Sequence, residues 1–140
     1  MQVNLENFRN AIASLRLILD RCQDESMMQG LDSVLQNAVR AGVIKHFEFT
    51  YEQSWLSIKK WLEINVNPDT GDGVPRRELF RLASEQRLID DVDCWMRYHR
   101  ARNQTSHTYR EATANEVYAV IPEFVEDAQR LLAALEARND

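Results

Sequence analysis

Fourteen residues in the C-terminal half of the chain, 97–110, hold four arginines, two histidines and no acidic residue. The whole chain carries 17 lysines and arginines against 22 aspartates and glutamates, a net charge of −5. Arginines spread over the surface would aid solubility equally well, so their concentration on an acidic protein indicates a binding site for an anion. The segment 97–110 is therefore the first candidate for a functional site.

Arg102, Asn103 and His107 have the side chains needed to cleave an RNA phosphodiester without a metal. A histidine with a pKa of about 6.5 can accept the proton of a 2′-hydroxyl at neutral pH. An arginine can donate paired hydrogen bonds to the phosphate oxygens as negative charge builds up on them. Asn103 could orient either of these groups.

The spacing leaves open whether Arg102 and His107 meet. On a continuous helix their side chains point about 140° apart, so they converge only if the helix end bends or a second copy of the chain supplies its own pair. The alternative is structural: both cations could cap the C-terminal end of the helix, where the dipole and exposed carbonyls favour positive charge. The pattern also leaves open whether His99 and Arg100 join the site.

Other kinds of site fit the sequence less well. Ser106 and His107 point apart as neighbours on a helix, and no G-x-S-x-G elbow surrounds the serine. His99 and His107 lack a third zinc ligand at a recognisable offset. The polar loop 65–73 lacks the spacing and the distal glutamate of a calcium-binding EF-hand. We therefore expect neither a metal nor an organic cofactor.

The elements that must position these side chains are helices. Only four glycines and three prolines occur in 140 residues, and apolar side chains recur at spacings of three and four. This pattern predicts helices over about 4–23, 28–64 with a bend or break at Gly42, 75–86, 90–103 and 113–135. The fold class is all-α: a single domain over 1–140 that forms an antiparallel four-helix up-and-down bundle with an additional short helix.

Particular residues mark the helix ends. Pro75 suits the first position of the short helix, and Asp90 or Asp91 can cap the helix that leads into the arginine-rich segment. Thr113, with a glutamate three residues later, matches a capping box and predicts the start of the last helix, which Pro122 should kink. A stripe of aromatic side chains over 43–64 is assigned to core packing.

The cysteines and the hydropathy indicate in which cellular compartment the protein is expected. Cys22 and Cys94 lie far apart within helical patterns and are expected to be reduced, buried thiols. No run of about 18 apolar residues occurs, and the first ten residues lack the basic and apolar regions of a secretion signal. We expect a cytoplasmic protein with no membrane partner. The acidic net charge disfavours indiscriminate nucleic-acid binding but not binding at one local patch.

The run Arg102–Tyr109, RNQTSHTY, resembles the signature of the HEPN family: an arginine, four residues of which the first is commonly asparagine, a histidine, one residue and a tyrosine. The segment 45–55, KHFEFTYEQSW, is similar to the aromatic helix of the bacterial branch often called nucleotidyltransferase substrate-binding proteins. Leu88–Asp91 and Trp95 also look like that branch. The resemblance covers nearly the whole chain.

This resemblance implies a homodimeric HEPN-like helical bundle, encoded beside a minimal nucleotidyltransferase (MNT) partner as a toxin–antitoxin pair. It implies a metal-independent endoribonuclease toxin that acts on RNA, with Arg102 and His107 as the active pair near the dimer cleft. Tyr109 matches the tyrosine at which partner-catalysed adenylylation silences related toxins. Phosphate charge added there would repel RNA.

A rival function is also implied by resemblance. The bundle resembles the C-terminal helical domain of aminoglycoside nucleotidyltransferases, so it could be a non-catalytic substrate-binding subunit of a two-component nucleotidyltransferase. Arg102 and His107 would then bind a substrate or nucleotide phosphates without cleaving anything. A third alternative is a module for dimerisation and assembly. The acidic net charge favours the binding functions, whereas the conjunction of Arg102, Asn103, His107 and Tyr109 favours the nuclease.

Overall fold

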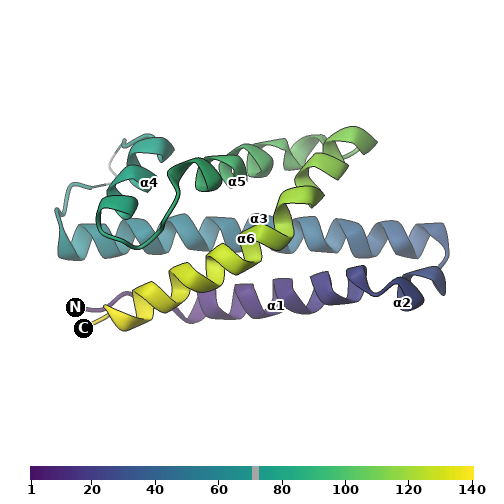
Figure 1. The fold of residues 1–140 in the computed structure, drawn as a ribbon, viewed down its shortest axis with the longest axis horizontal. Coiled ribbons are helices and arrows are strands. Elements are labelled where there is room, and N and C mark those ends of the chain that lie inside the picture. The colour runs from purple at the N-terminus through teal and green to yellow at the C-terminus, as the bar shows by residue number, and fades with distance from the viewer. Residues whose placement is uncertain (71–72) are drawn as a thin grey trace.

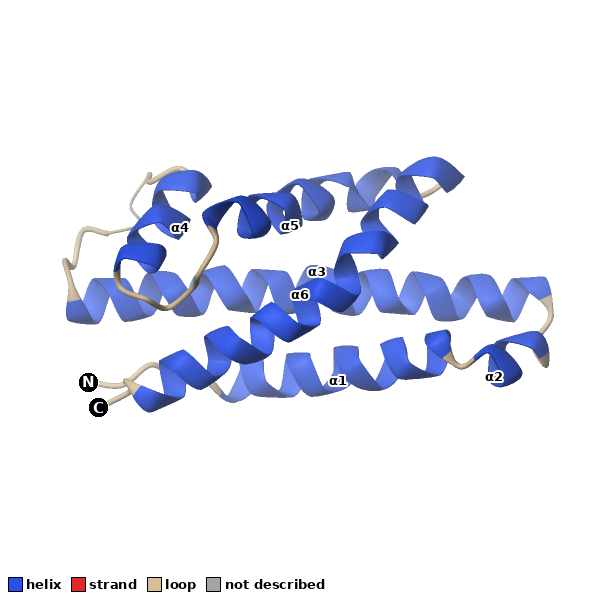
Figure 2. Cartoon of the chain, viewed as in Figure 1, coloured by secondary structure: helices blue, strands red, loops and turns tan. Residues whose placement is uncertain are grey.

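The computed structural model describes residues 1–70 and 73–140, and every regular element in them is a helix (Figure 1, Figure 2). In chain order these are α1 Glu6–Gln23, α2 Glu25–Gln29, α3 Ser33–Asn65, α4 Arg76–Glu85, α5 Val92–Gln104, the 3₁₀ turn η1 Thr105–His107 and α6 Glu111–Ala137. The predicted all-α class is confirmed. The loop predicted over 65–73 follows α3; residues 71 and 72 of that prediction lie outside the described part.

Four helices, α1, α3, α5 and α6, form the bundle. Successive members run in opposite directions along the long axis, and α6 crosses the others obliquely (Figure 1). The predicted up-and-down four-helix bundle is confirmed, with α4 as the additional short helix and α2 as a further short turn. Within the described residues no helix is both long and apolar enough to cross a membrane.

Gly42 lies within α3, which continues through it as one helix of 33 residues. A Cβ atom at this position would lie 2.7 Å from Cδ1 of Ile18 on α1. The missing side chain therefore lets α1 pack closely against α3. The prediction that one helix continues past Gly42 to about residue 64 is confirmed, whereas residues 28 and 29, predicted as part of it, belong to the separate helix α2. The glycine serves packing between two helices, which the local sequence does not reveal.

Two substitutions at Gly42 should differ in effect. Alanine favours a helix over glycine by about 1 kcal/mol, but its Cβ must displace the end of the Ile18 side chain. We expect these terms to offset, so that Gly42→Ala changes the free energy of unfolding by less than about 1 kcal/mol. Gly42→Val adds two further methyl groups and should cost about 1–3 kcal/mol. Urea titrations measure both, and equal stabilities for the two variants would contradict the close contact.

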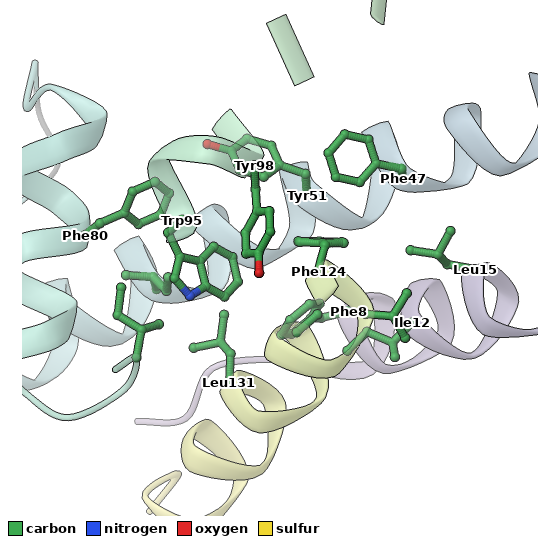
Figure 3. Close-up of a cluster of buried hydrophobic side chains, with 14 of the residues drawn as sticks. Phe8, Ile12, Leu15, Phe47, Tyr51, Phe80, Trp95, Tyr98, Phe124 and Leu131 are labelled. Carbon is green, nitrogen blue, oxygen red and sulfur yellow. The ribbon is translucent and has the colours of Figure 1, made fainter. Parts of the chain in front are cut away.

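An aromatic cluster joins α3, α5 and α6 inside the bundle (Figure 3). The ring of Phe124 on α6 meets Phe47 of α3 edge to face, with centroids 5.0 Å apart, and Tyr98 of α5 at 5.2 Å. Trp95 packs against Tyr98 at 5.4 Å. Such edge-to-face pairs add to the free energy gained from burying the rings. Phe124 is thus the contact through which α6 holds α3 and α5 together.

The structure shows how α5 and α6 begin. The Asp91 carboxylate accepts hydrogen bonds from the backbone N–H of Asp93 at 2.9 Å and of Cys94 at 3.4 Å, which confirms the predicted cap of α5. α6 begins at Glu111, so the predicted start at Thr113 is wrong: the tight turn after α5 leads into the new helix sooner than the capping pattern indicated. α6 continues through Pro122, and its axis changes direction near the middle (Figure 1).

The two ends of the chain are joined by Asn139. Its side-chain oxygen accepts a 2.8 Å hydrogen bond from the N–H of Val3, and its side-chain nitrogen donates one of 2.9 Å to the Val3 carbonyl. The termini consequently lie side by side at one end of the bundle (Figure 1). Cys22 and Cys94 are free thiols, as expected, but they are half-buried rather than buried.

Candidate functional site

The arginine-rich segment occupies the end of α5 and the turn after it. α5 gives way to η1 at Thr105. The Thr105 hydroxyl donates a 2.7 Å hydrogen bond to the carbonyl oxygen of Arg102, and the Thr108 hydroxyl donates one of 3.2 Å to the carbonyl oxygen of Thr105. These hydroxyls satisfy carbonyls that a helix end leaves without partners, so the chain tightens into a 3₁₀ turn. The α-helix therefore ends before the motif histidine is reached.

Arg102 is half-buried and faces Glu52 of α3. Arg102 Nε lies 3.3 Å from Glu52 Oε1, and Arg102 Nη1 lies 3.3 Å from the Thr105 hydroxyl. The other carboxylate oxygen of Glu52 accepts a 3.0 Å hydrogen bond from Trp55 Nε1. Among the described residues Arg102 Nε makes no in-line hydrogen bond, so its contact with Glu52 is a charge pair. Glu52 thus fixes the guanidinium in place while leaving it N–H donors for an anion.

His99 connects the buried core with the surface of α5. His99 Nδ1 lies 2.8 Å from the Tyr51 hydroxyl of α3, and His99 Nε2 lies 3.4 Å from the side-chain nitrogen of Asn103. Burial lowers the pKa of His99, and the positive charge of Arg76 lowers it further. Burial also raises the pKa of Tyr51. At neutral pH His99 is therefore an uncharged imidazole and Tyr51 a protonated phenol.

The surface around His99 is positively charged. Three arginines lower the pKa of His99 through their charge: Arg76, Arg100 and Arg102. Glu52 is the carboxylate that opposes them. Arg76 reaches this surface from the first turn of α4, where its guanidinium carbon stacks 3.5 Å from the centroid of the Trp55 ring. Three cations against one carboxylate form a site suited to a phosphate group.

Lowering the pH is expected to destabilise the protein through His99. Its pKa in the folded protein lies below the ordinary value of 6.5, so stability is fully present above about pH 6.5 and falls as the pH drops below it. Urea titrations from about pH 7.5 to about pH 5.5 should show this fall, and a smaller fall in His99→Asn, which can still bond Tyr51 but does not titrate. Equal falls in the two proteins would contradict the assignment.

His107 and Tyr109 lie outside this half-buried cluster. Both are exposed, Tyr109 at 75 %, and their rings meet edge to face with centroids 6.1 Å apart. The Arg110 guanidinium lies 5.4 Å from the centroid of the Tyr109 ring. Across the described parts of the chain, no hydrogen bond or ion pair joins Arg102 to His107. Within one chain the predicted pair is thus divided between a half-buried arginine and an exposed histidine.

A groove lies beside Tyr109, between α3 and the start of α6. It has a volume of about 730 Å³, and its lining includes Arg40, Thr108, Tyr109 and Asn115. A volume of this size accommodates a nucleotide. The surroundings of the Tyr109 ring therefore leave room for a large group attached to its hydroxyl.

The sequence pattern does not reveal the whole cluster. It assigns Tyr51 and Trp55 to core packing and gives no role to Glu52 or Arg76. Tyr51 is buried, at 1 % exposure, yet it directs its hydroxyl to His99. The sequence signal for Glu52 is a glutamate within an otherwise aromatic helix face. No sequence signal points to Arg76, because only the folded chain brings α4 near α5.

Cys94, Glu123 and Asp127 form a separate group whose potential metal-binding atoms lie within 4.8 Å of one another. Arg97 donates hydrogen bonds of 2.9 and 3.1 Å to the two Glu123 carboxylate oxygens, and the Tyr98 hydroxyl donates to Asp127. Burial raises the pKa of Cys94 to about 11, so the thiol keeps its proton at neutral pH. These groups are already engaged in a polar network that ties α5 to α6.

Comparison with known proteins identifies the family. Residues 3–137 match the family described as nucleotidyltransferase substrate binding protein like. The probable ribonuclease HepT of Haemophilus influenzae is 33 % identical to this chain over 139 residues, which cover 99 % of this chain and 95 % of that protein. The family assignment therefore extends over nearly the whole sequence.

Two solved structures share the fold. HI0074 from Haemophilus influenzae, described as revealing the fold of a substrate binding domain of a nucleotidyltransferase, has a TM-score of 0.91 at 33 % identity over 95 % of this chain and 99 % of that one. A Thermus thermophilus protein has a TM-score of 0.72 at 23 % identity over 91 % of this chain and 98 % of that one, and shows the fold alone. The chain thus belongs to the nucleotidyltransferase substrate-binding-protein-like family, the branch of the HEPN family that its motif resembles.

Proposed function

We propose that the protein is a metal-independent endoribonuclease of the HEPN toxin type. The observation that carries this proposal is the positive surface at the end of α5. There Glu52 fixes Arg102 beside Asn103 in sequence, and η1 leads to an exposed His107. The similarity to a relative named as a probable ribonuclease supports the same activity.

In the proposed reaction His107 accepts the proton of a ribose 2′-hydroxyl, whose oxygen attacks the adjacent phosphorus. Arg102 and Asn103 donate hydrogen bonds to the non-bridging oxygens, which gain negative charge in the transition state. The bond from phosphorus to the 5′-oxygen breaks, that oxygen takes up a proton from water as it leaves, and His107 returns its proton to solvent. The products are a 2′,3′-cyclic phosphate and a 5′-hydroxyl.

The proposed active form is a homodimer. Because Arg102 and His107 of one chain make no direct contact, a facing copy that brings its own pair would complete the phosphate-binding cleft. The exposure of His107 and Tyr109 leaves this end of the bundle accessible to such a copy. Light scattering should give the mass of two chains, and a strict monomer would count against this arrangement.

The proposed partner is a minimal nucleotidyltransferase encoded as an antitoxin, acting in the cytoplasm. It would adenylylate Tyr109: the phenolic oxygen attacks the α-phosphorus of ATP, the bond to pyrophosphate breaks, and the phenolic proton is lost to solvent. The 75 % exposure of Tyr109 and the groove beside it support this role. The added phosphate charge would repel RNA from the neighbouring positive surface.

The test of the nuclease is RNA cleavage in EDTA. Purified protein, shown by mass spectrometry to be unmodified at Tyr109, is incubated with a mixed RNA pool beside the double variant Arg102→Ala/His107→Ala. We expect cleavage by the wild type alone, with 2′,3′-cyclic phosphate ends. Absence of cleavage by the wild type, or equal cleavage by the double variant, would overturn the proposal.

A second candidate function is a non-catalytic substrate-binding subunit of a two-component nucleotidyltransferase. The observation that favours it is the likeness to HI0074, whose fold is described as that of a substrate binding domain. In this role Arg102 and the positive surface around it would hold an anionic substrate for the partner. Stimulation of the partner's nucleotidyl transfer by a wild type that leaves RNA intact would favour this function over the nuclease.

A further inference from the structure

Three side chains form a continuous hydrogen-bonded line from the core to the surface beside Arg102. Tyr51 is buried, His99 is half-buried and Asn103 is exposed. The Tyr51 hydroxyl lies 2.8 Å from His99 Nδ1, and His99 Nε2 lies 3.4 Å from the Asn103 amide. His99 and Asn103 stand one turn apart on α5, so a rigid helix fixes the second contact.

The first hydrogen bond has a defined direction. Burial disfavours the charged phenolate, so Tyr51 keeps its proton. Within the described residues the partner of this buried hydroxyl is His99 Nδ1, at 2.8 Å. If Nδ1 donated this hydrogen bond, the phenolic hydrogen would be buried without an acceptor, which is unfavourable. Tyr51 therefore donates, and His99 Nδ1 accepts.

The direction of the hydrogen bond from Tyr51 to His99 determines the orientation of the Asn103 amide. A neutral imidazole that accepts at Nδ1 carries its own proton on Nε2, so His99 Nε2 is a donor. It must therefore meet the oxygen of the Asn103 amide. The atom placed 3.4 Å from His99 Nε2 is the amide nitrogen, and a half-turn of the amide puts the oxygen there with almost no change of shape. In this orientation the oxygen faces His99 and the NH₂ group points away from it.

We propose that Tyr51 and His99 are positioning residues that fix the Asn103 amide so that its NH₂ group faces the phosphate of bound RNA. This inference rests on the proposed nuclease function and adds two residues from outside the motif to its site. With the NH₂ group held outward, Asn103 offers hydrogen-bond donors beside those of Arg102. An amide rotating between its two orientations would instead present its oxygen to the phosphate part of the time, and an oxygen repels a phosphate.

The same geometry excludes His99 as the general base. Both of its nitrogens are engaged, one by Tyr51 and one by Asn103. The positive charges of Arg76, Arg100 and Arg102 further disfavour its protonated form. His107 is exposed and makes no such pair of contacts within the described residues. The two histidines of the segment therefore have different tasks, His99 as a fixed link and His107 as a proton acceptor.

The kinetic test is a double-mutant cycle with Tyr51→Phe and Asn103→Ala. Tyr51→Phe keeps the ring in the core and should lower kcat about tenfold, the rate equivalent of one ordinary hydrogen bond, with little change in KM. Asn103→Ala should lower kcat about 10²-fold, and Tyr51→Phe should then have no further effect. Tyr118→Phe on α6, outside the site, is the matched control and should leave kcat unchanged. If the losses from Tyr51→Phe and Asn103→Ala multiply, the proposal is overturned.

A second measurement does not depend on cleavage. The ¹⁵N chemical shifts of the His99 ring should show the proton on Nε2 in the wild type, and Tyr51→Phe should shift the population towards the Nδ1–H form. A proton on Nδ1 in the wild type would overturn the proposal. Absence of RNA cleavage by the wild type would instead refute the nuclease function itself, so the two failures are distinguishable.

Discussion

The variant His107→Ala is expected to cleave RNA about 10²–10⁴-fold more slowly than the wild type, because it lacks the group that accepts the 2′-hydroxyl proton. The His107 side chain is exposed, so the loss should not arise from unfolding. The melting temperature should move by no more than the few degrees that correspond to a cation lost near a helix end. Single-turnover cleavage rates and thermal melts on the same preparations measure both quantities.

The neighbouring variant Ser106→Ala is the matched control for His107→Ala. Ser106 is also exposed in η1, so its removal disturbs the turn to a similar degree. We expect its cleavage rate to equal that of the wild type, which also tests whether the serine acts as a nucleophile. A His107→Ala protein that cleaves at the normal rate, or that is largely unfolded, would show that the histidine is not the catalytic base.

The variant Phe124→Ala is expected to lose about 3–5 kcal/mol of folding free energy. Phe124 is fully buried, and its ring touches the aromatic rings of both α3 and α5. Small domains are stable by only about 5–15 kcal/mol, so much of this protein's stability would disappear. Urea titration measures the loss. Cleavage should fall with the folded fraction, since Tyr51 and His99 come from the helices that Phe124 joins.

Two further variants locate the effect of Phe124→Ala in the core. Phe124→Leu leaves a smaller cavity and should cost clearly less than the alanine. Phe49→Ala removes a phenylalanine of α3 that is 50 % exposed, and should change stability by no more than about 0.5 kcal/mol. If Phe124→Ala lowered the free energy of unfolding as little as Phe49→Ala, the aromatic cluster would not be what holds the helices together.

Local sequence predicts the features that depend on neighbouring residues. The helical periods, the Asp91 cap and the loop after α3 all follow from interactions over a few residues, and the structure confirms them. The packing role of Gly42 does not follow from local sequence, because the deciding contact is with Ile18 on another helix. The predicted start of α6 at Thr113 is wrong because η1 shortens the connection after α5, so that α6 already begins at Glu111.

Local sequence likewise predicts only some residues of the candidate site. The motif residues are contiguous, so the sequence locates Arg102 and His107 as candidates, and their catalytic roles stay predictions. The partners of Arg102 and His99 come from α3 and α4, and nothing near the motif points to Glu52, Tyr51 or Arg76. Their contribution depends on distances of a few ångströms between helices, which the order of residues along the chain does not specify.

The hydrogen bonds between Asn139 and Val3 hold the two ends of the chain together. Both ends lie at one end of the long axis of the bundle, whereas the η1 turn lies towards the other (Figure 1). A tag, a fluorophore or a surface anchor fixed to either terminus would therefore project away from the motif. Both termini can carry such a group together, so the molecule can be immobilised by one end and labelled at the other with the motif facing outward.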